Sequence, residues 1–322
     1  MPTSLLDQVR EACREVSRRA TLVRIDFERL PAYAASLPPA RAAAPALDPA
    51  HHYHGDVEGT VAFVVTLDAV NFGSGWFPHL RKRPGLSGYF TVATSLGEHF
   101  RAHGPIPADA LAAITADECA RLFGQDAANV EAMELMALFA RALNDLGRYL
   151  LERFGGSFTA LVAAAEGSAE RLAGLLRQMA FFDDVEEYAG ARVPFFKRAQ
   201  LTAADLSLAL GGEGPGRFRD LHRLTIFADN LVPHVLRVDG LLRYDAGLAE
   251  RIDAGELIAP GSPEEVEIRA CALHAVELLT EALRDEKPRV TAMGLDYLLW
   301  NRGQEPHYKQ VKPRHRTRTV FY

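Results

Sequence analysis

Cysteine is scarce in this 322-residue sequence, and long apolar runs are absent. The three cysteines, Cys13, Cys119 and Cys271, lie far apart and form neither a CxxC pair nor a metal-binding spacing, so we expect free thiols in a reducing compartment. The N-terminal segment lacks the apolar core of a signal peptide. The best apolar run, Val61–Leu67, is much too short to cross a bilayer. These absences predict a soluble, cytoplasmic chain with no membrane partner.

Positive charge is also in short supply, because the formal net charge is −6. Proteins that bind duplex DNA or bulk RNA usually carry a basic surface, since neutralising phosphates supplies much of the affinity. We therefore expect no nucleic-acid polymer as a partner. The exception is the stretch from Asn301 to Tyr322, which contains six basic residues and one acid, Glu305. This stretch is either a solvated basic tail or a source of contacts to the phosphate of a small nucleotide.

Apolar residues at three- and four-residue spacing predict a mostly helical, all-α fold. The clearest segment, Val130–Phe154, spans about seven turns at 3.6 residues each and predicts a long central helix. The β-branched run Val61–Val65 lies in a longer apolar segment, for which we favour a buried helix over a strand. Further helices are predicted over Leu5–Val16, Asp26–Ser36, Gly88–His103, Ala169–Met179, Arg198–Leu210, Arg217–Phe227, Leu231–Asp239, Pro263–Arg284 and Thr291–Asn301.

Capping residues mark several predicted helix starts, and the composition of the chain shows no domain boundary. Ser262 followed by Pro263 and Glu265 combines a serine cap, a proline at the first helical position and a glutamate three residues after the cap. Thr115 and Glu118 form a second capping box. No shift in composition divides the chain, so we predict one mostly helical domain over residues 1–322 with a continuous core.

Two segments carry side chains suited to a planar ligand. The segment His51-His52-Tyr53-His54 has no matching cysteine or acid cluster, so we expect no metal there and instead interpret His52 as a ligand contact. In NFGSGWFPH, the rings of Phe72 and Trp76 suit stacking on a flat heterocycle, and the amide of Asn71 suits reading a polar edge. An aromatic-rich turn in the core remains an equal alternative.

Charged residues at two helix starts are further candidates. In PFFKRAQ, the two basic residues Lys197 and Arg198 would ordinarily be solvated, but Lys197, beside two phenylalanines, is alternatively close to a pocket wall. In FADNLVP, Asp229 or Asn230 precedes Pro233, and the pattern by itself favours a helix cap. A cap position does not exclude catalysis, because a carboxylate at a helix start can face a junction between two helices.

Six segments, taken in order, carry a more specific signal: NFGSGWFPHLRKR, PFFKRAQLTAADL, FADNLVPHVL, SPEEVEIRACALHAVELL, LDYLLWNRG and RHRTRTVFY. Together they resemble the queuosine salvage proteins, the queuosine 5′-phosphate N-glycosylase/hydrolase family. The likeness extends from about His51 to Tyr322. The first fifty residues, predicted as N-terminal helices, are the least diagnostic part of the chain.

The resemblance implies an α-helical fold similar to that of helix-hairpin-helix DNA glycosylases. It implies hydrolysis of queuosine 5′-phosphate to queuine and ribose 5-phosphate, so that the base returns to tRNA modification. It places the catalytic aspartate at Asp229 and an active-site lysine at Lys197. Asn230 stands where tyrosine is usual and His234 where glutamine is usual, so the contacts around the ribose are expected to differ while the carboxylate stays.

The chemistry of the bond explains the carboxylate. Cleavage leaves positive charge on C1′ and the ring oxygen, and a fixed anion stabilises that charge more than it stabilises the neutral substrate. Queuine is a 7-deazapurine, so protonation at N7 is unavailable to the leaving base. We therefore expect Asp229 to stabilise the sugar cation, with Asn71 and Asp296 bonding to the base edges and Lys197 acting on the sugar, the phosphate or the charge of the carboxylate.

The remaining predicted contacts hold the ring and the phosphate. Phe72, Trp76 and Trp300 are expected to clamp the faces of the base, and the phosphate is expected to recruit cations among Arg198, Lys309, Arg314 and Arg316. No cofactor, no metal and no obligate protein partner are expected, because hydrolysis requires only water. Two alternatives stay open: a non-catalytic binding protein for queuine or its nucleotide, and a DNA-repair glycosylase.

Overall fold

The structure is a computed structural model that describes residues 4–286 and 289–322, and 57% of it is helical. Only two small sheets accompany the helices, so the prediction of a mostly helical fold is confirmed. Within the described part of the chain, none of the helices combines the length and the apolar character needed to span a membrane.

The chain forms two compact units. Unit 1 consists of Met1–Pro45, Asp184–Lys197 and His222–Arg318, and unit 2 of Ala46–Asp183, Arg198–Leu221 and Thr319–Tyr322. Each unit is therefore assembled from segments that are distant in the sequence. The expectation of one continuous domain over 1–322 stays a prediction.

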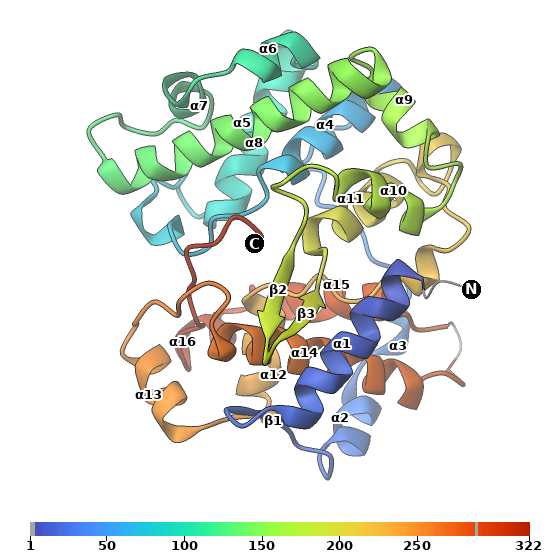
Figure 1. The fold of residues 1–322 in the computed structure, drawn as a ribbon, viewed down its shortest axis with the longest axis vertical. Helices are drawn as coiled ribbons and strands as arrows, with labels where there is room; N and C mark the ends of the chain where they lie inside the picture. Colours follow the sequence, from blue (N-terminus) through green and yellow to red (C-terminus); the bar gives the residue numbers. More distant parts are fainter. Residues whose placement is uncertain (1–3, 287–288) are drawn as a thin grey trace. The chain divides into compact units, whose positions relative to one another are not determined.

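Unit 1 is built around helix α14 (Pro263–Ala282), which contacts α1 (Leu5–Arg19), α2 (Leu30–Ser36), α12 (Leu231–Val238) and α15 (Ala292–Arg302) (Figure 1). Two antiparallel strand pairs belong to this unit: β1 (Val23–Ile25) with β4 (Leu242–Tyr244), and β2 (Val185–Tyr188) with β3 (Ala191–Pro194). Three shorter helices complete it: α3 (Pro39–Ala42), α13 (Ala246–Asp253) and α16 (Pro306–Gln310).

Unit 2 is built around helix α8 (Val130–Phe154), which contacts α4 (Val57–Ala69), α6 (Ala108–Ala113), α7 (Ala116–Leu122) and α9 (Phe158–Ala163) (Figure 1). The unit also contains α5 (Gly88–His103), α10 (Ala169–Leu176) and most of α11 (Lys197–Ala209). The short 3-10 helices η1 (Phe77–His79) and η2 (Gly214–Gly216) lie in its loops, whereas η3 (Leu221–Arg223) lies where the chain returns to unit 1.

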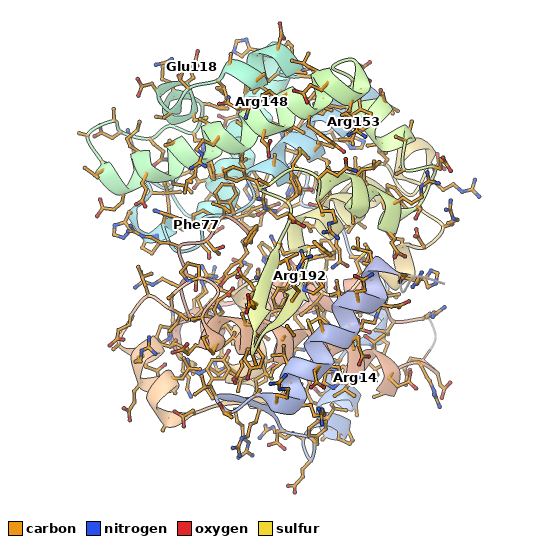
Figure 2. The ribbon with its side chains drawn as sticks, in the orientation of Figure 1. Arg14, Phe77, Glu118, Arg148, Arg153 and Arg192 are labelled. Carbon is orange, nitrogen blue, oxygen red and sulfur yellow. The ribbon has the colours of Figure 1, made fainter. Side chains whose placement is uncertain are left out.

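Most predicted helices and caps are confirmed. Helix α8 has the predicted bounds: the Asn129 side chain accepts the Ala132 N–H at its start, and Gly155 ends it with a left-handed φ of 59°. The β-branched run Val61–Val65 lies in α4 and is buried. Glu118, labelled in Figure 2, closes the predicted capping box with Thr115.

The predicted helix Arg217–Phe227 is wrong. Only η3 is helical there, and the Asp220 side chain instead accepts the Ser168 hydroxyl and the Ala169 N–H at the start of α10. The helix expected from Asp26 begins at Leu30, because the Asp26 carboxylate accepts the Arg29 N–H and pairs with Arg243. In both places an aspartate carboxylate, Asp220 or Asp26, bonds to a group that is distant in the sequence, and the backbone around the aspartate is not α-helical.

Candidate functional site

The segment before α12, which contains Asp229, is held at successive positions in unit 1. The Phe227 N–H donates to Asp296 Oδ1 at 2.9 Å, and the Ala228 carbonyl accepts from Arg269 Nε at 2.9 Å. The Asn230 Nδ2 group donates to the His315 carbonyl at 3.0 Å. Bonds from three other segments therefore fix a short stretch of irregular backbone.

Asp229 is 9% exposed and caps α12. Its Oδ1 accepts the N–H groups of Leu231 at 2.7 Å and Val232 at 3.1 Å. The cap expected from the pattern is therefore real, and it falls on Asp229 rather than Asn230, whose side chain makes no cap bond. The two cap bonds use Oδ1 and leave Oδ2 outside the cap.

Asn230 and His234 both attach the C-terminal segment. Asn230 bonds to His315, as described, and His234 Nε2 lies 2.7 Å from the Tyr308 carbonyl. Because a carbonyl only accepts, Nε2 carries the proton and Nδ1 is an acceptor. Burial lowers the pKa of His234, so its imidazole is neutral near pH 7.

Lys197 begins α11 after two phenylalanines that are each 1% exposed. Its side chain is 6% exposed, and its backbone N–H donates to Asp184 Oδ2 at 3.1 Å. The residue before it, Phe196, has a φ of 49°, in the left-handed region that an aromatic residue seldom adopts. Such backbone strain persists where surrounding bonds enforce it, and it is enriched at functional sites.

A buried ion pair connects the segment that contains Asp229 with the start of α11 at Lys197. Arg269, on α14, is fully buried and binds Asp184 in a bidentate manner, with Nη2–Oδ2 at 2.6 Å and Nη1–Oδ1 at 3.0 Å. Glu265, one turn earlier on the helix, accepts from Nη1 at 3.3 Å. The guanidinium carbon lies 3.9 Å from the ring centroid of Phe195. The sequence motifs predicted no functional role for Arg269 or Asp184, and they predicted Glu265 only as part of a helix start.

Their signal in the sequence was weak. Glu265 and Arg269 are four residues apart in a helix that carries several other acids, and this spacing is equally typical of a solvated ion pair. Asp184 lies in the acidic stretch FDDVEEY, where nothing distinguishes it from its neighbours.

Among the predicted phosphate ligands, Arg314 interacts with the charge of Asp229. Burial lowers the pKa of Arg314, and the Asp229 carboxylate opposes that shift. Lys309 and Lys312 are exposed. Burial, aided by nearby cations including Arg269, lowers the pKa of His315 to about 3, so this neighbour of Arg314 is neutral.

Two more predicted substrate contacts lie on α15 in unit 1. Asp296 is 5% exposed, and its Oδ1 supports the backbone of Phe227. Trp300, one turn later on the same helix, is partly buried. The structure thus gives Asp296 a contact to the segment that carries Asp229, and its predicted bond to the base stays a prediction.

The predicted contacts in unit 2 are largely engaged within that unit. Phe72 is 1% exposed, meets the ring of Phe139 edge-on at 5.1 Å, and has the Arg198 guanidinium carbon 4.8 Å from its centroid. Trp76 is 3% exposed and Asn71 is partly buried. The alternative of an aromatic core turn describes Phe72 well, and the predicted stacking on a base stays a prediction.

Arg198 and His52 also have partners of their own. The two terminal nitrogens of Arg198 donate to the carbonyls of Asp68, Ala69, Phe181 and Val320. At 1% exposure, this guanidinium supports the backbone of unit 2 and is poorly placed for a phosphate. The Nδ1 of His52 lies 2.7 Å from the Asp48 carbonyl and its Nε2 2.8 Å from the Tyr89 hydroxyl, so both ring nitrogens are engaged.

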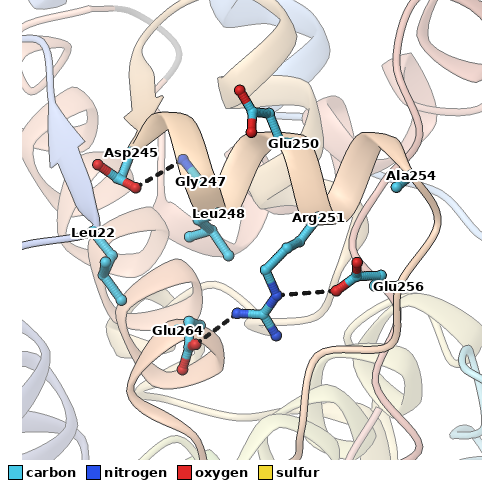
Figure 3. Close-up of a pocket in the computed structure, with 9 residues that line it drawn as sticks. All are labelled: Leu22, Asp245, Gly247, Leu248, Glu250, Arg251, Ala254, Glu256 and Glu264. Atoms are coloured by element: carbon cyan, nitrogen blue, oxygen red, sulfur yellow. Dashed lines mark hydrogen bonds and ion pairs between the residues drawn. The ribbon is translucent and has the colours of Figure 1, made fainter.

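A surface hollow of about 580 Å³ in unit 1 contains none of the predicted site residues (Figure 3). Its central cation, Arg251, is neutralised by Glu256 at 3.1 Å and Glu264 at 2.9 Å. Asp245 and Glu250 add further acid to the rim. A phosphate ester would be repelled there, so this hollow is not the candidate site. Across the described ranges, no group of three His, Cys, Asp or Glu side chains is arranged to hold a metal ion.

Comparison with known proteins gives one consistent result. The family model described as queuosine salvage protein matches residues 51–322. A Sphaerobacter thermophilus protein is 37% identical over 315 residues, which cover 96% of each chain. A Mus musculus protein is 32% identical over 336 residues, with 97% of this chain and 98% of that one covered, and a Bos taurus protein is 33% identical with 83% of each chain covered. Each relative is named queuosine 5′-phosphate N-glycosylase/hydrolase.

Proposed function

This chain belongs to the queuosine salvage protein family, and from that premise we propose that it hydrolyses the N-glycosidic bond of queuosine 5′-phosphate. Water adds across the bond between C1′ and the base nitrogen. The products are queuine, which leaves with the proton, and ribose 5-phosphate, which keeps the new hydroxyl. The reaction has water as its only co-substrate, so the proposal includes no organic cofactor.

The observation that carries this proposal is the geometry of Asp229. The carboxylate is buried, and two backbone N–H groups fix its Oδ1 at the start of α12. A carboxylate that cannot reorient gives its full effect against positive charge developing at C1′, because no reorganisation is needed during the reaction. Oδ2 lies outside the cap and is the atom that we assign to the sugar or to the attacking water.

The leaving base sharpens the need for that anion. In a 7-deazapurine, carbon replaces N7, so protonation at N7 cannot assist departure. The sugar then carries more of the positive charge at the transition state, and an anion beside it contributes more to the rate. We assign Asp296 and the ring of Trp300 to the base, alongside the bond that Asp296 makes to Phe227.

We assign the phosphate to Arg314 first and to Lys309 second. Arg314 is partly buried and interacts with the charge of Asp229, whereas Lys309 is exposed. Arg198 is better explained as a backbone support, because four carbonyls already take its terminal N–H groups. We further propose that the helical arrangement is similar to that of helix-hairpin-helix DNA glycosylases and that the protein acts in the cytoplasm, which its buried, free cysteines support.

The test is incubation of the purified chain with queuosine 5′-phosphate, followed by chromatography and mass spectrometry of the free base. We expect release of queuine with wild-type protein, slower release from unphosphorylated queuosine, and almost none with Asp229→Asn. Tight binding of the nucleotide without release would identify a binding protein instead. Salt-sensitive binding to duplex DNA, with base excision from it, would identify a DNA-repair glycosylase.

A further inference from the structure

One unbroken series of polar contacts connects the segment of Asp229, to which we assign catalysis, with Lys197, which the family resemblance places in the active site. The Ala228 carbonyl, one residue before Asp229, accepts from Arg269 Nε at 2.9 Å. Arg269 Nη2 donates to Asp184 Oδ2 at 2.6 Å, and the same oxygen accepts the Lys197 N–H at 3.1 Å. Three hydrogen bonds therefore span the distance from residue 228 to residue 197, and all of them lie within unit 1.

Asp184 fixes the approach to Lys197 at two further points. Its carbonyl accepts the N–H groups of Phe195 at 2.9 Å and Phe196 at 3.2 Å. These bonds hold Phe196 in its left-handed conformation, at a φ of 49°. Releasing Asp184 would free this backbone to relax, and Lys197 would move with it.

The energetics of buried charge indicate that Arg269 and Asp184 serve to position other groups more than to stabilise the fold. Arg269 is 0% exposed, and the Asp184 and Glu265 side chains are 2% and 1% exposed. Desolvating such groups costs about as much as their attraction returns, and apolar replacements are often equally stable. Apolar side chains cannot reproduce the planar guanidinium of Arg269, which binds both oxygens of Asp184. The same group donates from Nε to the Ala228 carbonyl in a fixed direction.

We propose that Arg269 and Asp184 are positioning residues that jointly set where Lys197 and Asp229 stand relative to each other. This inference rests on the proposed function, since it assigns a role in the same reaction. Arg269 acts through the backbone of the segment that carries Asp229. Asp184 acts through the backbone on both sides of Phe196 and through the first N–H of α11.

The primary test compares Arg269→Lys with Glu267→Gln, a matched control on the same helix. Glu267 is 1% exposed and accepts the N–H groups of Thr21, Leu22 and Val23 and the hydroxyl of Tyr188. It therefore supports unit 1 without bonding to the Asp229 segment or to Lys197. Turnover of queuosine 5′-phosphate, KM and the melting temperature are measured on the same preparations, at a temperature where circular dichroism shows each variant to be folded.

We expect Arg269→Lys to lower kcat by about 30- to 100-fold with KM changed by less than about threefold, because displacements near 1 Å have effects of this size. Glu267→Gln is expected to lower the melting temperature while the folded protein keeps wild-type kcat. A folded Arg269→Lys protein with wild-type kcat would overturn the inference. So would a loss of kcat that only follows the loss of folded protein.

A second variant covers the case in which a single change leaves a buried charge and prevents folding. Asp184→Asn and Glu265→Gln with Arg269→Met removes all three buried charges together. If these charges serve stability alone, this triple variant recovers both folding and turnover. Positioning predicts that it folds and stays at least about 30-fold slow. Failure of the wild-type protein to release queuine would refute the proposed function, whereas wild-type turnover with fast variants would refute only the positioning role.

Discussion

Asp229 accepts the backbone N–H groups of both Leu231 and Val232 through one carboxylate oxygen, Oδ1, at 2.7 and 3.1 Å. The cap and the proposed catalytic charge thus belong to the same side chain but to different parts of it. An asparagine at this position would keep an oxygen for the cap and lose the negative charge. Substitution can therefore separate the two roles.

We predict that Asp229→Asn lowers kcat by at least about 100-fold, since removing one preorganised electrostatic group has an effect of about this size. The free energy of unfolding should change by less than about 1 kcal/mol, because asparagine is as good a cap as aspartate. Steady-state kinetics and urea unfolding measure the two quantities. Asp229→Ala serves as the control and should lose turnover and, in addition, about 1 kcal/mol of stability. Near-normal turnover by folded Asp229→Asn would exclude the assignment.

Arg314 provides a test of the phosphate site. We predict that Arg314→Met raises KM for queuosine 5′-phosphate by about tenfold or more, as expected for the loss of a charged hydrogen bond. KM for the unphosphorylated nucleoside should change little, and the exposed Lys312→Met should affect neither substrate. If Arg314→Met lowers kcat on both substrates equally, Arg314 acts on Asp229 and not on the phosphate.

Glu186 predicts a pH dependence of stability. Burial, with the carboxylates of Glu265 and Asp184 nearby and Arg269 opposing them, raises the pKa of Glu186 to about 7, from an ordinary value of 4.5. The folded protein then holds a proton that the unfolded chain releases, so this group lowers stability as the pH rises from 4.5 to 7.

Glu186→Gln cannot ionise and should lack that decrease. At pH 8 the variant should be more stable than wild type by about 1–2 kcal/mol, a figure reduced from the full linkage value because the side chain is partly open to water. Near pH 4.5 the two proteins should be equal. Urea unfolding at both pH values measures this, with the exposed Glu187→Gln as the control. Parallel pH curves for wild type and Glu186→Gln would contradict the prediction.

Two glycines on helices of unit 2 should respond in opposite ways to alanine. A Cβ at Gly147, on α8, would lie 2.3 Å from Ala112 N and 2.5 Å from Ala108 O on α6, so Gly147→Ala should cost about 2 kcal/mol through overpacking. A Cβ at Gly174, on α10, meets nothing within 4 Å. Gly174→Ala should therefore stabilise the protein by about 0.5–1 kcal/mol through helix propensity. Urea unfolding compares them, and equal effects would show that the contact between α6 and α8 is not tight.

Helices and their caps were predictable because the interactions that make them are local. The bounds of α8 follow from the apolar spacing, the cap at Asn129 and the glycine at 155, all within one stretch of chain. The strands β1 and β4 were not predictable in this way, because their pairing joins residues 23–25 to residues 242–244. The wrong helix over Arg217–Phe227 has the same origin, since Asp220 and Phe227 bond to partners far along the chain.

The sequence by itself determined the helical class and the family, and it predicted Asp229 and Lys197 as active-site residues. Only the tertiary structure decided that Asp229 is the cap of α12, that four carbonyls occupy Arg198, and that Arg269 with Asp184 connects the Asp229 segment to Lys197. The reason is physical: periodicity and capping depend on residues a few positions apart. A buried charge finds its partner only when the folded chain brings distant segments within hydrogen-bonding distance.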